Sequence, residues 1–295
     1  MTNPLEACGG EPPDAGSPVG DPATSQSNAL FVLGAADPEM NAIEALLESL
    51  AIPHMRATVR GKRVYPANAY RATAPTVALE ALARGGHVYL VECVDPAPPG
   101  AVRIDHHRPG DRGYGRPPPE FWSASSLGQT VAALTGDLKL SVEVTPRMRL
   151  IAAADHCLGD AYAGHCPGVT PDALLRWHVA SRAAFERRDP AAVLEDLRTT
   201  HEVLQTAPRV TLAGDLEVVD VRHQRVPELL IAAARDGQCV LSAVTTRDGR
   251  TKVGCLVGSQ AQITAFMQEW APAHGLVDLY GDPVRGFAGA YVPKI

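Results

Sequence analysis

Four segments of this 295-residue chain place carboxylate or imidazole groups directly after an apolar run. They lead to Glu39 and Asn41, to Glu92, to Asp105-His106-His107 and to Asp155-His156. Because ligands of an open parallel sheet bind beyond the carboxyl ends of its strands, we expect these side chains to meet at one edge. Mixed Asp, Glu and His ligands suit Mn²⁺, Mg²⁺, Fe²⁺ or Zn²⁺, and two such ions can hold a phosphoryl group. The pattern therefore predicts a metal-binding cluster.

Short apolar runs and helical repeats alternate through the first half of the chain. Strands are predicted at 29–33, 87–93 and 102–104, and helices over 41–50, 76–84, 125–134 and 148–154. Serines at the start of the third helix and Gly136 at its end supply capping chemistry. Strands and helices that alternate with short connections imply a parallel α/β sheet.

The second half of the chain begins with helices and ends in a strand-rich region. Residues 170–206 carry apolar side chains at helical spacing, and Phe185 is among those expected to be buried. Beyond them the chain predicts strands at 210–212, 216–221, 240–244 and 253–257, with helices at 227–235 and 260–270. The fold class is therefore α/β: a parallel-sheet N-terminal domain over 29–165, a helical connector over 166–207 and a smaller α/β C-terminal domain over 208–295. The Pro- and Gly-rich residues 1–28 are predicted to form a disordered tail.

Charge and composition limit the classes of partner. The net charge is −6, from 33 acids and 27 bases, which argues against a protein that coats nucleic acid non-specifically. The tail holds four acids and no Lys or Arg, so the remaining chain is close to neutral and can carry a local basic pocket. Since only 5% of residues are aromatic, we expect a small phosphorylated substrate or short oligonucleotide, not a stable complex with long nucleic acid.

The compartment is predicted from what the sequence lacks. No apolar run approaches the ~18 residues of a membrane span, and no basic segment followed by an apolar run marks a secretory leader. The six cysteines are scattered without a CxxC pair, so reduced thiols and a cytoplasmic location are expected. A homodimer is left open.

The motifs around the predicted cluster resemble a known family. Ile104-Asp105-His106-His107 follows a strand, and Ser123-Ala124-Ser125-Ser126-Leu127-Gly128 then opens a helix, as in the DHH phosphoesterase superfamily. Glu92 lies where that family has an acid after its second strand, and Asp155 where it has its fourth acid. Residues 281–289 resemble its closing glycine-rich stretch. The tripeptide alone could be a surface turn, but the order of the segments covers nearly the whole chain after the tail.

The resemblance implies a two-domain α/β hydrolase, a phosphodiesterase or phosphatase, in which a metal-activated water attacks phosphorus. The cofactor would be a divalent metal, manganese first, with magnesium, iron or zinc as alternatives. The implied metal ligands are Glu92, Asp105, His106 and Asp155, with Glu39 and Asn41 as further candidates. His107 would lie beside the phosphate and protonate the leaving oxygen, so the implied catalytic residues are His107 and Asp105.

The first metal motif departs from the family pattern. Ala35 stands at the place of a histidine, and Glu39 and Asn41 stand where the family has two aspartates. An alanine cannot ligate a metal and an amide is a poor bridging ligand, so one ion is expected rather than two. Glu39 and Asn41 fit equally well as the first-turn acid and cap of a helix.

Substrate contacts are expected from a basic loop and from the closing motif. The candidates are Arg108, Arg112, His156, Arg285, Gly286 and Gly289. Guanidinium groups on a glycine-containing loop can hold phosphate oxygens, although a solvated basic loop is an equal alternative. A separate zinc site at His156, Cys157, His165 and Cys166 is disfavoured, because each Cys directly adjoins its His.

Two functions follow. The first is a metal-dependent phosphoesterase that hydrolyses a small phosphorylated molecule or short nucleotide. The alternative is a catalytically silent relative that binds a nucleotide or phosphorylated ligand, motivated by Ala35 and Asn41.

Overall fold

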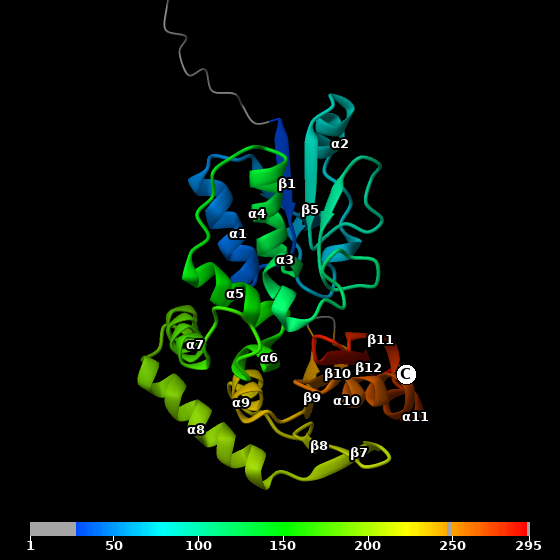
Figure 1. Cartoon of the computed structure of the whole chain (residues 1–295). Coiled ribbons are helices and arrows are strands. Elements are labelled where there is room, and N and C mark those ends of the chain that lie inside the picture. The colour runs from blue at the N-terminus through cyan, green and yellow to red at the C-terminus, as the bar shows by residue number, and fades with distance from the viewer. Residues whose placement is uncertain (1–27, 247–248, 294–295) are drawn as a thin grey trace, which may run out of the picture.

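A four-stranded parallel sheet organises the N-terminal part of the computed structural model, which describes residues 28–246 and 249–293 (Figure 1). Its strand order is β2 (His54–Arg56), β1 (Ala29–Leu33), β5 (His87–Val91) and β6 (Val102–Ile104), all parallel. β1 is buried along its whole length because strands flank both of its edges and side chains cover both of its faces. The predicted tail lies outside the described residues, apart from Asn28.

Alternate residues of β1 serve two separate cores. Phe31 and Leu33 pack with one set of helices, and Leu30 and Val32 pack in the cluster on the other face. The first set comprises α1 (Pro38–Ser49), α4 (Ser126–Gly136) and α5 (Pro146–His156); α2 (Thr76–Ala83) lies on the other face. Two short strands, β3 (Thr58–Val59) and β4 (Lys62–Arg63), form a hairpin beside the second cluster.

Five further helices pack together around a core of their own. They are α3 (Phe121–Ala124), α6 (Leu158–Tyr162), α7 (Pro171–Glu186), α8 (Pro190–Thr206) and α9 (Leu229–Asp236). One hydrophobic cluster joins residues from all of them to the second sheet. The expectation that Phe185 is buried is wrong: it lies near the end of α7 and is 81% exposed.

The C-terminal part is a six-stranded mixed sheet. Its order is β11 (Val277–Asp282), β12 (Phe287–Tyr291), β10 (Thr251–Leu256), β9 (Val240–Thr245), β8 (Leu216–Asp220) and β7 (Arg209–Ala213). Only β8 and β9 are parallel. Helix α10 (Gln260–Ala265), a π-helical turn at 266–270 and α11 (Ala271–Ala273) pack against it through Ile263, Phe266 and Trp270.

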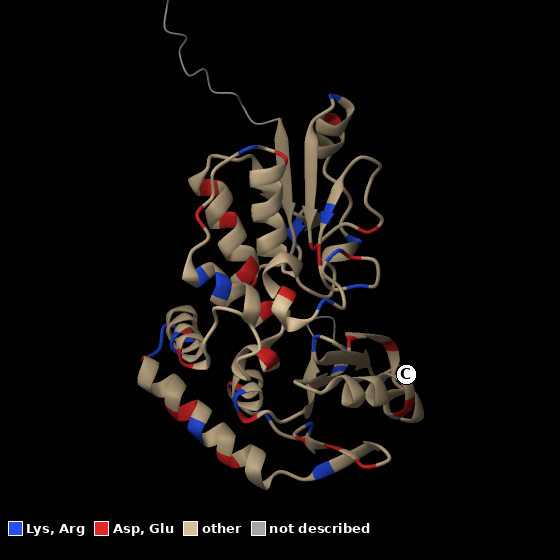
Figure 2. Cartoon of the chain, viewed as in Figure 1, with Lys and Arg blue, Asp and Glu red and all other residues tan. Residues whose placement is uncertain are grey.

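The predicted α/β fold class is confirmed, with a parallel sheet first, helices next and a second α/β unit last. The sequence did not predict α3 and α6, which are short, or β11 and β12, which each contain a glycine. Acidic and basic side chains alternate along α8, where Arg198 pairs with Glu195 and Glu202 (Figure 2). Among the described helices, none combines the length and the apolar content needed to cross a membrane.

Candidate metal centre

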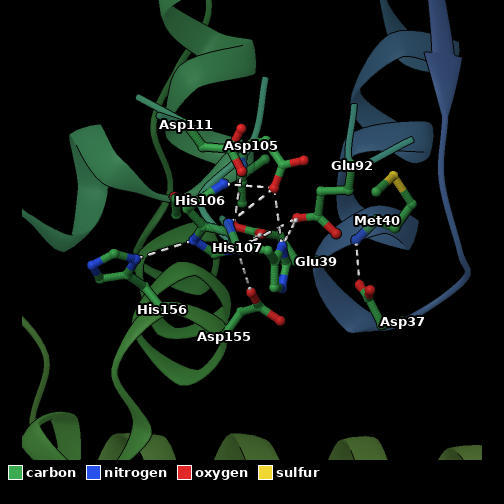
Figure 3. Close-up of polar contacts among 12 residues, drawn as sticks. Asp37, Glu39, Met40, Glu92, Asp105, His106, His107, Asp111, Asp155 and His156 are labelled. Carbon is green, nitrogen blue, oxygen red and sulfur yellow. Dashed lines mark hydrogen bonds and ion pairs between the residues drawn. The ribbon is translucent and has the colours of Figure 1, made fainter. Parts of the chain in front are cut away.

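The expected cluster forms at the carboxyl edge of the parallel sheet (Figure 3). Glu92 follows β5, the three residues 105–107 follow β6, and Glu39 lies in the first turn of α1, which follows β1. Asp155 comes from the last turn of α5. Parallel strands bring segments that are far apart in sequence to one edge, which is why the strand-end pattern could predict the site.

The backbone at this edge is held in a tight approach. Glu92 has a left-handed φ of 50° directly after β5. A Cβ on Gly34 would lie 2.5 Å from the Glu92 carbonyl oxygen, so only glycine permits the ends of β1 and β5 to come this close. Strain of this kind persists only where the surrounding structure enforces it, and it is common at functional sites.

Four side chains offer ligand atoms to one point. One atom from each of Glu92, His106, His107 and Asp155 lies within 4.8 Å of the others. His106 Nε2 is 3.0 Å from Asp155 Oδ2 and 3.4 Å from Glu92 Oε1. Glu39 Oε2 is 3.9 Å from the same nitrogen. His106 is fully buried, whereas the side chain of His107 is 34% exposed and is the member of the group that faces solvent most.

Hydrogen bonds behind the cluster assign the tautomer of His106. The carbonyl of Arg116 can only accept, so His156 Nε2, 3.0 Å away, carries a proton. Burial, together with the charge of Arg285, lowers the pKa of His156 to about 3, so its ring is neutral and its Nδ1 accepts. His106 Nδ1 therefore donates to His156 Nδ1 over 3.1 Å. Burial and Arg285 also lower the pKa of His106. With the proton on Nδ1, the lone pair of Nε2 faces Asp155 and Glu92, and Arg285 Nη2 lies 3.5 Å away.

Two buried carboxylate oxygens in this cluster, Glu39 Oε2 and Asp155 Oδ2, have no hydrogen-bond partner. Each faces His106 Nε2, so two carboxylate oxygens and a ring nitrogen lie close together at the inner wall of the site. Such groups are costly to bury alone, and a cation satisfies all of them at once. Carboxylate and imidazole ligands without a thiolate suit Mn²⁺, Fe²⁺ or Zn²⁺. The residues present therefore fit a divalent metal.

Three acids at or beside the cluster, Glu92, Glu39 and Asp37, resist ionisation. Burial raises the pKa of Glu92 to about 7, and the charges of Asp155 and Asp105 add to that rise. Burial, with the charges of Asp155 and Glu92, raises the pKa of Glu39 well above its ordinary value. Asp37 caps α1 through Met40 N, and burial and the charges of Glu92 and Asp155 raise its pKa to about 8. Repulsion between buried carboxylates is what a bound cation would relieve.

Asp105 lies under the two histidines, and its oxygens already accept several hydrogen bonds. Oδ1 accepts from the backbone N–H groups of His106 and His107, at 2.7 and 3.0 Å, and Oδ2 accepts from the Tyr70 hydroxyl at 2.9 Å. His107 Nδ1 donates to Oδ1 at 3.1 Å. Burial alone would raise the pKa of Asp105, but these bonds and the nearby histidines hold it below its ordinary value. The structure thus places Asp105 as an orienting partner of His107, and its role as a metal ligand stays a prediction.

Glu39 is fixed by the helix that faces it. Its Oε1 accepts a hydrogen bond from Leu127 N in the first turn of α4, at 3.1 Å. Ser125 caps this helix by accepting from Gly128 N. The serine-started helix predicted from the sequence thus points its first turn at the cluster, where the N–H of Leu127 has no partner within the helix and donates to Glu39. One oxygen of Glu39 is therefore held by α4, and the other faces His106.

Three predicted site residues lie outside the group of converging ligand atoms. Asn41 is exposed, and its amide oxygen accepts from Arg56 Nη2 at 3.0 Å. Arg108 stacks on the Tyr70 ring and donates to Asp95 Oδ2 at 2.7 Å, with 41% of its side chain exposed. Arg112 is exposed and lines a cavity beside β6.

Four residues predicted to touch substrate have structural partners instead. His156 is buried behind His106, and Arg285 is buried against backbone carbonyls. Gly286 has a φ of 76° and faces the Gly258 carbonyl, while a Cβ on Gly289 would lie 2.5 Å from the Tyr280 hydroxyl oxygen. Their assignment to substrate binding stays a prediction without a contact that supports it.

The disfavoured zinc set does not assemble around one point. Cys157 Sγ and Cys166 Sγ lie 3.2 Å apart, but His156 points to His106 and His165 pairs with Asp160 at 2.8 Å. Two further residues beside the cluster were not predicted from the sequence. Asp37 caps α1, and Tyr70 lies in a short 3₁₀ turn with no motif around it.

Comparisons with known proteins leave the family open. No family model and no curated protein matches the sequence. Among solved structures, the chain is similar to the pGpG-specific phosphodiesterase PggH from Vibrio cholerae, at 13% identity over 91% of this chain and 93% of that chain. The TM-score of 0.36 is too low for this likeness to carry an argument about fold or activity. Membership of the DHH superfamily therefore stays a prediction from the motifs.

Proposed function

We propose that this protein is a metal-dependent phosphoesterase that hydrolyses a small phosphorylated molecule or short nucleotide. The observation that carries the proposal is the convergence of Glu92, His106 and Asp155 on one point, beside unpartnered buried oxygens. These three residues would hold one divalent cation, with Mn²⁺ as the first candidate. A divalent cation supplies Lewis acidity toward a phosphate oxygen and an attacking water.

His107 supplies the proton chemistry of this proposal. Its Nδ1–H donates to Asp105, so its Nε2 is the atom available to a substrate. Asp105 fixes the ring orientation and stabilises the imidazolium, because it stays ionised at neutral pH. From the partly exposed position of His107, the imidazolium can donate to the leaving oxygen of a phosphate ester.

Two arginines of the loop that follows His107 favour an anionic substrate. Arg108 follows His107 directly, and its guanidinium is fixed in place by Tyr70 and Asp95 while a large part of it stays exposed. A guanidinium held in this way can bind phosphate oxygens with little loss of side-chain freedom. Arg112 extends the same loop into solvent. These two residues are therefore the substrate contacts that we retain.

A second candidate is a silent relative that binds a phosphorylated ligand without cleaving it. It is favoured by the position of Asn41, which pairs with Arg56, and by the buried Ala35, which offers no ligand atom. The two functions share the site and differ in turnover.

Elemental analysis and Mn²⁺ titration calorimetry test the proposal on the wild type and His106→Ala. We expect about one ion per chain in the wild type and none in the variant. Hydrolysis of bis(p-nitrophenyl) phosphate and of linear dinucleotides in Mn²⁺ then separates the candidates. Absence of metal binding by the wild type overturns the phosphoesterase, and binding without turnover across this panel favours the silent relative.

A further inference from the structure

Arg285 reaches from the C-terminal sheet into the wall of the metal cluster. It lies in the turn between β11 and β12, and only 3% of its side chain is exposed. Its Nε donates to the His156 carbonyl at 2.7 Å and its Nη1 to the His106 carbonyl at 2.7 Å. Its Nη2 donates to the Asp155 carbonyl at 2.9 Å. Every nitrogen of the guanidinium is thus engaged by the N-terminal half of the chain.

The turn that presents Arg285 is itself fixed. Asp282 is fully buried, and its Oδ1 accepts from the backbone N–H groups of Val284 and Arg285, at 3.0 and 3.3 Å. Its Oδ2 accepts from Gly115 N at 2.8 Å, in the loop that follows the three residues 105–107. One carboxylate therefore shapes the turn and also ties it to the loop beside the cluster.

The three carbonyls belong to the segments that carry the metal ligands. His106 and Asp155 are 49 positions apart in the sequence, yet their side chains meet at 3.0 Å. The planar guanidinium bonds the backbone of both residues at once and so fixes the distance between them. A lysine ammonium, a point charge on a flexible stem, cannot reproduce this fork.

We propose that Arg285 is a positioning residue that holds His106 and Asp155 at metal-binding distance, so that the site is complete only while the C-terminal sheet is docked. The inference rests on the metal site of the proposed function.

A positioning role and a purely electrostatic role of Arg285 predict opposite effects on metal binding when its side chain is removed. Arg285 Nη2 is 3.5 Å from His106 Nε2 and 3.8 Å from Asp155 Oδ2, so as a charge alone it would repel a cation. Removal of the side chain would then tighten metal binding, whereas removal of a positioning group weakens it.

Mn²⁺ titration calorimetry on Arg285→Met, Arg285→Lys and the wild type separates these effects. We expect both variants to bind Mn²⁺ at least about tenfold more weakly, as is typical when the partners that orient metal ligands are removed. Lysine keeps the charge, so a loss in both variants excludes a purely electrostatic role. Circular dichroism checks that each variant is folded. If Arg285→Met does not fold, Arg285→Lys alone tests the proposal.

Tyr114→Phe is the matched control. Its hydroxyl donates to the Gly281 carbonyl at 2.9 Å, a contact between the same two halves of the chain that touches no residue of the cluster. We expect this variant to lower the unfolding temperature while its Kd for Mn²⁺ stays within about twofold of wild type. If folded Arg285→Met binds Mn²⁺ as tightly as wild type or more tightly, the inference is wrong and the proposed function stands. A wild type that binds no Mn²⁺ overturns both.

Discussion

Glu92→Gln should have opposite effects on the fold and on metal binding. In the metal-free protein, Glu92 is a buried carboxylate that faces other acids, so its charge opposes folding. Glutamine keeps the size of the side chain and removes that charge. The same change removes a ligand oxygen 3.4 Å from His106 Nε2, so it should weaken Mn²⁺ binding.

The magnitude follows from the raised pKa of Glu92. Burial raises it from 4.5 to about 7, and a shift of one unit corresponds to 1.36 kcal/mol, so the ionised group costs at most about 3 kcal/mol. Because the pKa of the folded state is the higher one, the contribution of Glu92 to stability is fully present below pH 4.5 and is lost as the pH rises through about 7. We therefore expect Glu92→Gln to match wild type near pH 5 and to exceed it near pH 8.5. At ~2–4 °C per kcal/mol, the upper limit of the difference is about 6–12 °C.

Thermal unfolding in a chelator, at pH values between 5 and 8.5, measures this difference directly. Comparison of the two proteins at each pH cancels the contributions of His106 and His156, whose lowered pKa values act in the opposite direction below pH 6.5. Glu80→Gln changes an exposed side chain of α2; it is the control and should change nothing. Saturating Mn²⁺, at about 100 times its Kd, should add about 2.7 kcal/mol to wild type and less to Glu92→Gln. A variant less stable than wild type in chelator at pH 8.5 would refute this account of the site.

Three further predictions concern other parts of the site and its frame. His156→Ala removes the acceptor of the His106 Nδ1 proton, so Mn²⁺ affinity should fall about 10–100-fold by calorimetry, and an unchanged Kd contradicts the assigned tautomer. His107→Asn should lower phosphate release about 10²–10⁴-fold while one Mn²⁺ still binds, and retained turnover excludes its acid role. Gly128→Ala would place a Cβ 1.6 Å from the Trp122 carbonyl oxygen where α4 begins, so the unfolding temperature should fall sharply, and a normal value contradicts this packing.

The elements of the fold were predictable where the pattern of apolar residues is strong. β1 is a five-residue apolar run, and α1 repeats its buried positions at helical spacing. The edge strand β11 carries two Asp and a glycine, and its neighbour β12 has a glycine between two alanines, so neither produces such a pattern. Phe185 has the spacing of a core residue, yet it lies at the corner between α7 and α8, where no further element covers it. Local spacing cannot show where the packing of neighbouring elements ends.

The sequence predicted which strand ends carry the candidate site, but it did not predict the contacts that each side chain makes there. Glu92, His106 and Asp155 were expected together, and the structure groups them. The sequence could not show that His107 joins the group while Asp105 turns to Tyr70, because that depends on the conformation of three adjacent residues.

Long-range partners were the other limit. Arg285 is 179 residues from His106, and its contacts depend on how the two halves of the chain dock. The motif could place an arginine near the site, but only the docked structure shows that its nitrogens are occupied by carbonyls. A sequence pattern gives the type of a residue, whereas its role depends on which of its atoms have no hydrogen-bond partner within the protein.

The buried oxygens without hydrogen-bond partners favour a functional origin for the cluster. A site built only for stability would pair its buried acids with donors, as Asp282 is paired with three backbone N–H groups. Glu39 and Asp155 each keep a buried oxygen without a hydrogen-bond partner, and Glu92 retains its proton up to about pH 7. The ionised forms of Glu39 and Glu92 destabilise the metal-free fold, and apolar residues of similar size would remove that cost. Their arrangement around an unprotonated histidine nitrogen is therefore best explained by a cation that the folded protein binds and the unfolded chain does not.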